Sequence, residues 1–197
     1  TPGASSVYAR DMPGTYVGAV PGDVSTRRGC EDLAARASEI YGGRLDVLVN
    51  NAGAAWGEPL DRTSGRANWG FDKVLDLNVK GVFYLSVACA PLLEAAAGEG
   101  GPSRIVNVGS IAGITPQDAP THAYDASKAA VHHLTRKMAK DYAAKNITVN
   151  AIAPGYVKTR MSEGLGKYAD LETIRKNVPL GRLGNDEDMA GGGGGGG

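Results

Sequence analysis

Apolar and polar residues are arranged along the chain in two kinds of pattern. In the first, apolar positions recur every three or four residues, which predicts helices; these segments are 27–41, 69–97, 123–144 and 171–177. In the second, short runs are almost entirely apolar, which predicts strands buried on both faces; these segments are 16–20, 45–49, 105–108 and 147–153. Strand and helix alternate with short connections. This order predicts one α/β domain over residues 1–190, built on a parallel sheet with helices on both faces.

The composition argues against several classes of protein. Lysine plus arginine and aspartate plus glutamate both number 21, and no long run carries one sign of charge, so no nucleic-acid or polybasic membrane surface is expected. No apolar run reaches the ~18 residues of a membrane span. Cys30 and Cys89 fall on apolar faces of predicted helices, which is typical of small core residues in a reducing compartment. We therefore expect a cytoplasmic protein.

The carboxyl-terminal end has an unusual composition. Residues 191–197 are all glycine, and they follow a segment at Asn185 that resembles a helix start. A glycine run buries no apolar surface and favours no single conformation. We interpret 191–197 as a tag, a linker or placeholder residues outside the domain.

Polar and turn-forming residues follow each predicted strand. Asp23 follows the first strand, the Asn-Asn-Ala-Gly turn at 50–53 the second, Ser110 the third and Pro154 the fourth. The carboxyl ends of parallel strands meet at one edge of a sheet, where ligands bind. Taken singly, each is also an ordinary turn or helix-capping sequence. Taken together, they predict a binding site at this edge.

Tyr124 and Lys128 lie four residues apart in a predicted helix, so a phenol and an ammonium group share one helical face. A phenol titrates near pH ~10, and a neighbouring cation lowers its pKa. Lowering the pKa of the phenol to about 7 requires roughly 4 kcal/mol of interaction that favours the phenolate. A lysine in a partly dry cleft can supply this energy with help from a cationic cofactor ring. The same spacing also occurs by chance on solvated helices. The pair is a candidate acid/base centre.

The chain resembles the short-chain dehydrogenase/reductase family over about residues 16–190. The residues that carry the resemblance are Asp23, Val24, Asn50, Asn51, Ala52, Gly53, Asn78, Ser110, Tyr124, Lys128, Pro154, Gly155, Val157 and Thr159. The resemblance implies a Rossmann-like, doubly wound parallel sheet. It also implies an NAD(P)-dependent oxidoreductase that transfers a hydride between a nicotinamide cofactor and a carbonyl or secondary alcohol. The runs at 55–57 and 108–113 resemble those of 3-oxoacyl-thioester reductases and their rhamnolipid-type relatives, which favours NADP(H) over NAD(H).

The resemblance implies a role for each of these residues. Ser110 would bind the substrate oxygen, and Tyr124 would exchange a proton with it. Lys128 would lower the pKa of Tyr124 and bind the nicotinamide ribose. Asn78 would hold a water molecule that relays protons from Lys128; the alternative is a helix kink in which backbone groups satisfy its amide. The other residues would contact the cofactor: Asp23 and Val24 the adenine, Asn50 to Gly53 the adenosine ribose, and Pro154, Gly155, Val157 and Thr159 the nicotinamide amide.

Parts of the family pattern have no counterpart in the sequence. The Gly-rich turn that binds the pyrophosphate is not found near residues 1–10. We therefore expect the first two strands and the last strand of the family's sheet to be missing, either because the sequence is part of a longer polypeptide or because the product is truncated. Two other functions stay open. One is an inactive binding or regulatory protein on this fold; the other is a sugar-nucleotide epimerase, which would carry a larger carboxyl-terminal domain.

Other conspicuous side chains carry less functional information. His122, His132 and His133 have no carboxylate or cysteine at metal-ligand spacing, so we expect no metal site and interpret them as helix-surface or helix-start residues. For Trp56 and Trp69 we expect packing, with a substrate contact by Trp56 as the alternative. The segment 156–168 is polar and contains glycine, and its apolar residues Met161, Leu165 and Tyr168 do not identify the substrate. The resemblance implies a small carbonyl or alcohol substrate and a homodimer or homotetramer.

Overall fold

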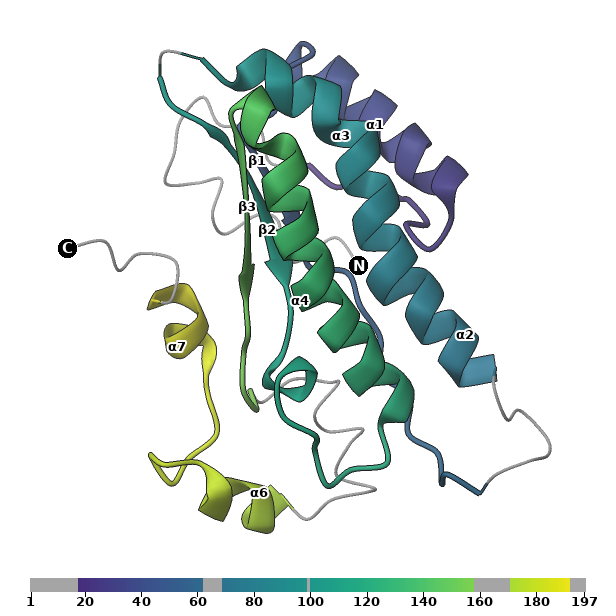
Figure 1. The fold of residues 1–197 in the computed structure, drawn as a ribbon, viewed down its shortest axis with the longest axis vertical. Helices are drawn as coiled ribbons and strands as arrows, with labels where there is room; N and C mark the ends of the chain where they lie inside the picture. Colours follow the sequence, from purple (N-terminus) through teal and green to yellow (C-terminus); the bar gives the residue numbers. More distant parts are fainter. Residues whose placement is uncertain (1–17, 62–68, 99, 158–170, 192–197) are drawn as a thin grey trace.

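The fold is that of a computed structural model, which describes residues 18–61, 69–98, 100–157 and 171–191 (Figure 1). In chain order the elements are α1 (Arg27–Tyr41), β1 (Val47–Asn50), α2 (Trp69–Leu75), the π-helical η2 (Asp76–Gly81), α3 (Val82–Ala96), β2 (Ser103–Val108), the 3-10 helix η3 (Ile111–Gly113), α4 (His122–Tyr142), the 3-10 helix η4 (Ala143–Lys145), β3 (Ile147–Ile152), α6 (Leu171–Asn177) and α7 (Asp186–Gly191). The four predicted helices are all confirmed.

The three strands form one parallel sheet in the order β1-β2-β3. The helices α2 and α3 connect β1 to β2, and α4 connects β2 to β3. Strand–helix–strand connections of this kind have a nearly invariant hand. A sheet that grows in one direction therefore places its connecting helices on the same face.

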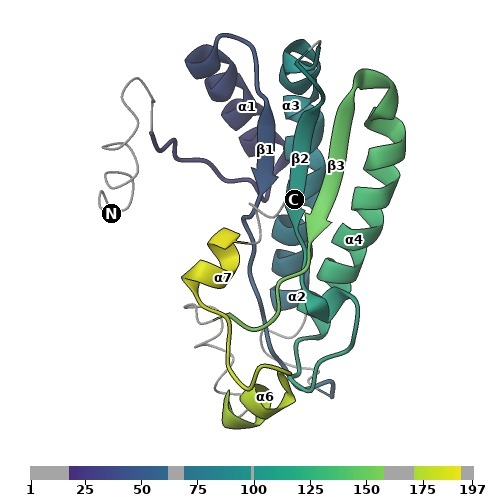
Figure 2. The same ribbon diagram turned by 90° about the vertical axis from the view of Figure 1, so that its left-hand side faces the viewer.

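This rule accounts for the face of the sheet that the described helices α1, α3 and α4 leave uncovered. Helices α1, α3 and α4 lie against one face, and the core between them and the sheet includes the buried side chains of Ile105 and Ile147 (Figures 1 and 2). On the other face, Val47 and Val49 of β1 are 44% and 54% exposed. We expected helices on both faces of the sheet. In the described part of the chain, α1, α3 and α4 lie on the same face, because the order of the strands does not reverse. The parallel α/β architecture is confirmed.

The strand predicted at 16–20 is not confirmed. Residues 16 and 17 lie outside the described part of the chain, and residues 18–20 form no strand. Among the described strands, β1 pairs only with β2, so residues 18–20 have no partner there for a hydrogen-bonded ladder. The chain instead leads into α1, whose N-cap is Thr26, and the helix ends at Gly42 with a φ of 63°.

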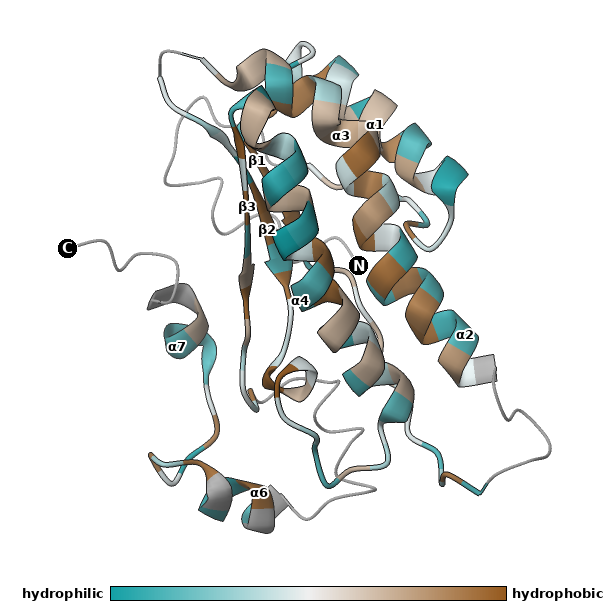
Figure 3. Cartoon of the chain, in the orientation of Figure 1, coloured by the Kyte–Doolittle hydropathy of each residue, from teal (hydrophilic) through white to brown (hydrophobic). Residues whose placement is uncertain are grey.

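The helix predicted over 69–97 is continuous but not uniform. Its middle part, Asp76–Gly81, is π-helical, a local irregularity that occurs frequently at functional sites. Apolar residues are prominent along α2 and α3 as well as along the strands (Figure 3). By length and composition alone, Gly70–Ala96 would be able to cross a membrane, but core helices of soluble proteins meet the same test. This helix packs against α1, β1 and β2.

The carboxyl-terminal helix α7 begins where the sequence predicts a helix start. The backbone N–H of Asn185 donates to Asp188 Oδ2 at 2.9 Å, and the N–H of Asp188 donates to Asn185 Oδ1 at 3.0 Å. This reciprocal pair is a capping box. The N–H of Gly184 donates to the carbonyl of Tyr156 at 2.8 Å, so the segment before α7 is fixed beside the chain that leaves β3.

Candidate active site

The residues predicted to bind a ligand surround a cavity beyond the carboxyl ends of the strands. We call this cavity, of about 540 Å³, the catalytic pocket. Its lining includes Asn51, Ala52, Gly53, Ser110, Tyr124, Lys128, Pro154, Gly155 and Val157. Parallel strands bring segments that are far apart in the sequence to this one edge. The structure therefore brings together nine of the residues that sequence reasoning selected.

Lys128 is almost completely buried beside the pocket. Its side chain is 6% exposed, and its Nζ donates to the carbonyl oxygen of Val108 at 2.7 Å. The same Nζ lies 5.5 Å from the centre of the Tyr124 ring. Burial lowers the pKa of Lys128 to about 8, because a charged ammonium is poorly solvated there.

The pKa of Tyr124 shifts in the direction opposite to the prediction. Burial raises the pKa of Tyr124 above its ordinary value; a side-chain hydrogen bond with Ser110 opposes this rise, and the nearby carboxylate of Asp125 adds to it. The predicted lowering of this pKa by Lys128 is wrong for this structure. The reason is geometric, since the Lys128 ammonium bonds a backbone carbonyl and faces the Tyr124 ring.

Ser110 caps a helix, which is one of the two interpretations of a serine after a strand; its role toward a substrate stays a prediction. It is the N-cap of η3, and its Oγ accepts a hydrogen bond from the N–H of Ala112 at 3.1 Å. This bond occupies a lone pair of Oγ but leaves the hydroxyl hydrogen to be donated elsewhere. Ser110 also lines the catalytic pocket, so the cap holds in place a hydroxyl that can act as a donor.

Asn78 lies in η2 and is 1% exposed. Its Oδ1 accepts from the N–H of Ala54 at 2.9 Å, and its Nδ2 donates to the carbonyl of Ala54 and to Ser127 Oγ, both at 2.9 Å. The amide is thus satisfied within an irregular helix, as the alternative interpretation describes. A role in holding a water molecule stays a prediction. The observed contacts fix the turn after β1 against the helix that carries Asn78.

Asn50 does not line the catalytic pocket, unlike the other residues of its turn. Its Nδ2 donates to Ser86 Oγ at 3.0 Å and to Asn107 Oδ1 at 2.8 Å. Asn107 in turn donates from Nδ2 to Thr135 Oγ1 at 2.9 Å. The Asn50 amide belongs to a buried polar network that joins β1, β2, α3 and α4. The predicted contact of Asn50 with the cofactor stays a prediction.

The remaining predicted residues lie elsewhere. The carboxylate of Asp23 accepts from the N–H and O–H of Ser25 at 3.0 and 2.6 Å, and neither Asp23 nor Val24 lines the catalytic pocket. Their contact with the adenine stays a prediction, and Thr159 lies outside the described residues. The Trp56 ring packs on Gly70, where an added Cβ would lie 2.1 Å from it, which confirms the packing interpretation.

We expected His132 to be a helix-surface or helix-start residue, but its side chain contacts the turn that contains Ser110. Its Nε2 lies 2.9 Å from the carbonyl oxygen of Ser110, whereas its neighbour His133 is exposed. Sequence reasoning missed this contact. The spacing of four residues from Lys128 was the available signal, because it places His132 on the same face of α4.

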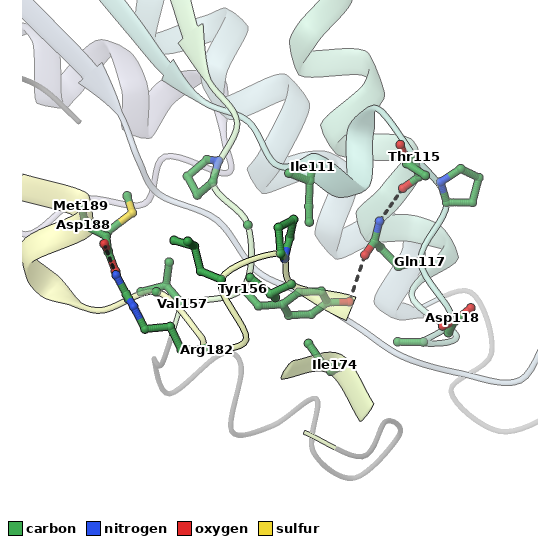
Figure 4. Close-up of a pocket in the computed structure, with 18 residues that line it drawn as sticks. Ile111, Thr115, Gln117, Asp118, Tyr156, Val157, Ile174, Arg182, Asp188 and Met189 are labelled. Atoms are coloured by element: carbon green, nitrogen blue, oxygen red, sulfur yellow. Dashed lines mark hydrogen bonds and ion pairs between the residues drawn. The ribbon is translucent and has the colours of Figure 1, made fainter. Parts of the chain in front are cut away.

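A second cavity, of about 790 Å³, adjoins the catalytic pocket; we call it the outer cavity (Figure 4). Its lining is largely apolar and includes Ile111, Pro116, Ile174, Val178, Leu180 and Met189. Tyr156 lines both cavities, and its hydroxyl donates to Gln117 Oε1 at 3.0 Å. At one end of the outer cavity, Arg182 pairs with both carboxylate oxygens of Asp188.

Comparison with known proteins identifies the family. A family model described as short chain dehydrogenase matches residues 7–169. The chain belongs to this family. It is 40% identical over 87% of its length to the rhamnolipids biosynthesis 3-oxoacyl-(acyl-carrier-protein) reductase of Pseudomonas aeruginosa. It is 38% identical over 85% of its length to a 3-oxoacyl-(acyl-carrier-protein) reductase of Thermotoga maritima.

Solved structures agree with the family assignment. The RhlG protein of Pseudomonas aeruginosa, in a complex with NADP, matches with a TM-score of 0.79 and 39% identity over 87% of this short-chain dehydrogenase chain and 66% of RhlG. A gluconate 5-dehydrogenase of Burkholderia cenocepacia, in complex with NADP and tartrate, matches with a TM-score of 0.74 and 29% identity over 86% of this chain and 64% of that one. The Rossmann-like fold is thereby confirmed. The chain spans 66% and 64% of the two curated reductases, just under two thirds.

Proposed function

We propose that this chain forms the catalytic part of an NADP(H)-dependent oxidoreductase that reduces a ketone, such as a 3-oxoacyl thioester, to a secondary alcohol. The observation that carries the proposal is the convergence of Ser110, Tyr124 and Lys128 on one pocket with the turn at 51–53. A donor, an acid and a cation around one cavity are the groups that carbonyl reduction needs.

The residues of the catalytic pocket suit a nicotinamide cofactor. An added Cβ at Gly53 would lie 3.3 Å from Asn78 Oδ1 and 3.8 Å from Lys128 Nζ, so the turn after β1 passes close to both side chains. Lys128 would hold the ribose hydroxyls, and the chain at 154–157 would hold the carboxamide. When bound, the nicotinamide supplies the hydride. The NADP complex of the RhlG relative supports NADP(H) over NAD(H).

The protonation states of the pocket suit the reductive direction. Because burial raises the pKa of Tyr124, its phenol carries a proton at neutral pH and can give it to the oxygen of a reduced carbonyl. The Ser110 hydroxyl would donate to the same oxygen and orient it. Lys128, with its pKa lowered to about 8, exchanges protons readily near neutral pH. It is therefore a suitable group to pass protons towards the pocket.

The outer cavity supports an acyl substrate. It adjoins the catalytic pocket, and its largely apolar lining would stabilise a hydrocarbon chain by removing it from water. The two curated relatives named above are both 3-oxoacyl-(acyl-carrier-protein) reductases, which agrees with this substrate class.

A homodimer or homotetramer and a cytoplasmic location belong to the same proposal. Phe83 and Val87, one turn apart on α3, are 41% and 42% exposed, and Phe71 on α2 is 37% exposed. Large apolar side chains on a helix surface are typical of an interface between protein chains. We propose that a second copy of the chain covers them.

A titration followed by nicotinamide fluorescence tests the function. We expect NADPH to bind more tightly than NADH. Tyr124→Phe should keep the NADPH affinity and lower the turnover of acetoacetyl-CoA by roughly 100-fold or more, because the phenol proton is lost. Tyr142→Phe is the matched control, since Tyr142 packs near the core at the other end of α4. Failure of both cofactors to bind, or full turnover by Tyr124→Phe, would contradict the proposal.

A further inference from the structure

His132 contacts the backbone of the residue that carries the proposed donor hydroxyl. Its Nε2 lies 2.9 Å from the carbonyl oxygen of Ser110 and 3.5 Å from the Ser110 backbone nitrogen. The same carbonyl oxygen accepts from the N–H of Gly113 at 3.0 Å. A carbonyl oxygen has two lone pairs, and these two donors use both of them.

The contact fixes the protonation of the imidazole. Because a carbonyl oxygen only accepts, the Nε2 of His132 must carry a hydrogen. A nitrogen with that hydrogen has no lone pair in the ring plane for the Ser110 N–H. The 2.9 Å contact is therefore the hydrogen bond, and the 3.5 Å contact is only proximity.

The imidazole also fills a space that two glycines leave open. An added Cβ at Gly109 would lie 2.4 Å from Cε1 of His132, and one at Gly113 would lie 2.7 Å from Cδ2. Both distances are far inside van der Waals contact. The ring thus lies between the two ends of the turn that contains Ser110. At Gly113 the turn also packs directly on the α4 backbone, because an added Cβ there would lie 2.5 Å from the carbonyl carbon of Lys128.

The opposite side of the turn is bonded to the chain at the end of β3. The N–H of Gly109 donates to the carbonyl of Ile152 at 2.8 Å, and the N–H of Ile111 donates to the carbonyl of Pro154 at 3.1 Å. His132 supplies the corresponding contact from α4, the helix that also carries Tyr124 and Lys128.

We propose that His132 is a positioning residue that sets the distance between the Ser110 hydroxyl and the acid/base pair on α4. The inference rests on the proposed role of Ser110 as the donor to the substrate oxygen. A misplacement of about 1 Å in such a group can lower a rate by about 100-fold. The packing of Gly113 on the α4 backbone fixes one end of the turn, and the hydrogen bond and ring of His132 hold the part that carries Ser110.

Three variants separate the parts of this role. His132→Leu removes the donor while keeping much of the side-chain volume, and His132→Gln retains an N–H donor of similar reach. His133→Leu is the matched control, because His133 is exposed on the same helix. With NADPH and acetoacetyl-CoA, we expect His132→Leu to lower kcat by about tenfold or more, with KM and NADPH affinity little changed. The Gln variant should recover most of the rate, and the control should match the wild type.

Two NMR measurements test the geometry without any turnover. The ring nitrogens of wild-type His132 should show hydrogen on Nε2, and the Gly113 amide should exchange faster in His132→Leu than in the control. An undiminished kcat in His132→Leu, equal losses in the Leu and Gln variants, or hydrogen on Nδ1 alone would overturn the inference. If the wild type lacks turnover, the proposed function fails, while the NMR results still decide whether His132 holds the turn. If the Leu variant does not fold, the Gln variant and the wild-type spectrum decide.

Discussion

Replacing Lys128 by methionine should stabilise the fold while it removes a charged group from the candidate active site. Lys128 is 6% exposed, and burial lowers its pKa from 10.5 to about 8. At about 1.4 kcal/mol per pKa unit, keeping this ammonium charged in the folded protein costs about 3 kcal/mol at pH 7. Methionine removes this cost, but it also removes the hydrogen bond to the Val108 carbonyl, which offsets about 1–2 kcal/mol. We expect a net gain of about 1–2 kcal/mol at pH 7.

The pH dependence of this gain is the decisive measurement. The pKa of Lys128 is lower in the folded state than in the unfolded state, so between about pH 8 and pH 10.5 the unfolded state binds more protons. Wild-type stability should therefore rise with pH across this window relative to Lys128→Met. Below pH 8 the lysine is charged in both states, and the advantage of the variant is largest. Urea unfolding at pH 7, 8.5 and 10 measures the difference.

A surface lysine on the same helix provides the control. Lys137 is 60% exposed and pairs with Asp141, so Lys137→Met should change stability by less than about 0.5 kcal/mol at each pH. The reasoning is refuted if the difference between Lys128→Met and the wild type is the same at pH 7 and pH 10. It is also refuted if Lys128→Met is the less stable protein at pH 7.

Two further substitutions test the buried network and the exposed helix face. Asn107 is completely buried, and Asn107→Leu removes one hydrogen bond from each of Asn50 and Thr135, which keep only Ser86 Oγ and the Val131 carbonyl as partners. The substitution should cost about 2–4 kcal/mol in urea unfolding; a loss no larger than that of the exposed Asn150→Leu would contradict this. Phe83→Glu should convert an oligomer to a monomer, because it places a charge at the proposed interface. Light scattering after gel filtration measures the molar mass, and an unchanged molar mass would exclude this face of α3 as the interface.

The helices could be predicted because their signals are local. The repeat over 27–41 and the stop at Gly42 coincide with the bounds of α1. The covered face of the sheet could not be predicted in the same way. Val47 and Val49 are as apolar as the strand residues that face the core, and only the order of the strands decides that they are exposed. The strand predicted at 16–20 likewise needs a partner strand, which its own residues do not specify.

The residues of the candidate active site divide in the same way, into those with a local sequence signal and those whose partners lie on other elements. Tyr124 and Lys128 could be found because they lie four residues apart on one helix, whereas the buried side-chain contacts of Asn50 depend on partners from other elements. Asn50 and Asn107 are register partners in β1 and β2, so aligning the two apolar runs before assigning roles would have paired their amides. His132 follows from the same rule that selected Lys128, because another four residues along α4 reach the same face. A polar side chain on such a face needs a partner from the neighbouring element, and for His132 that partner is the Ser110 carbonyl.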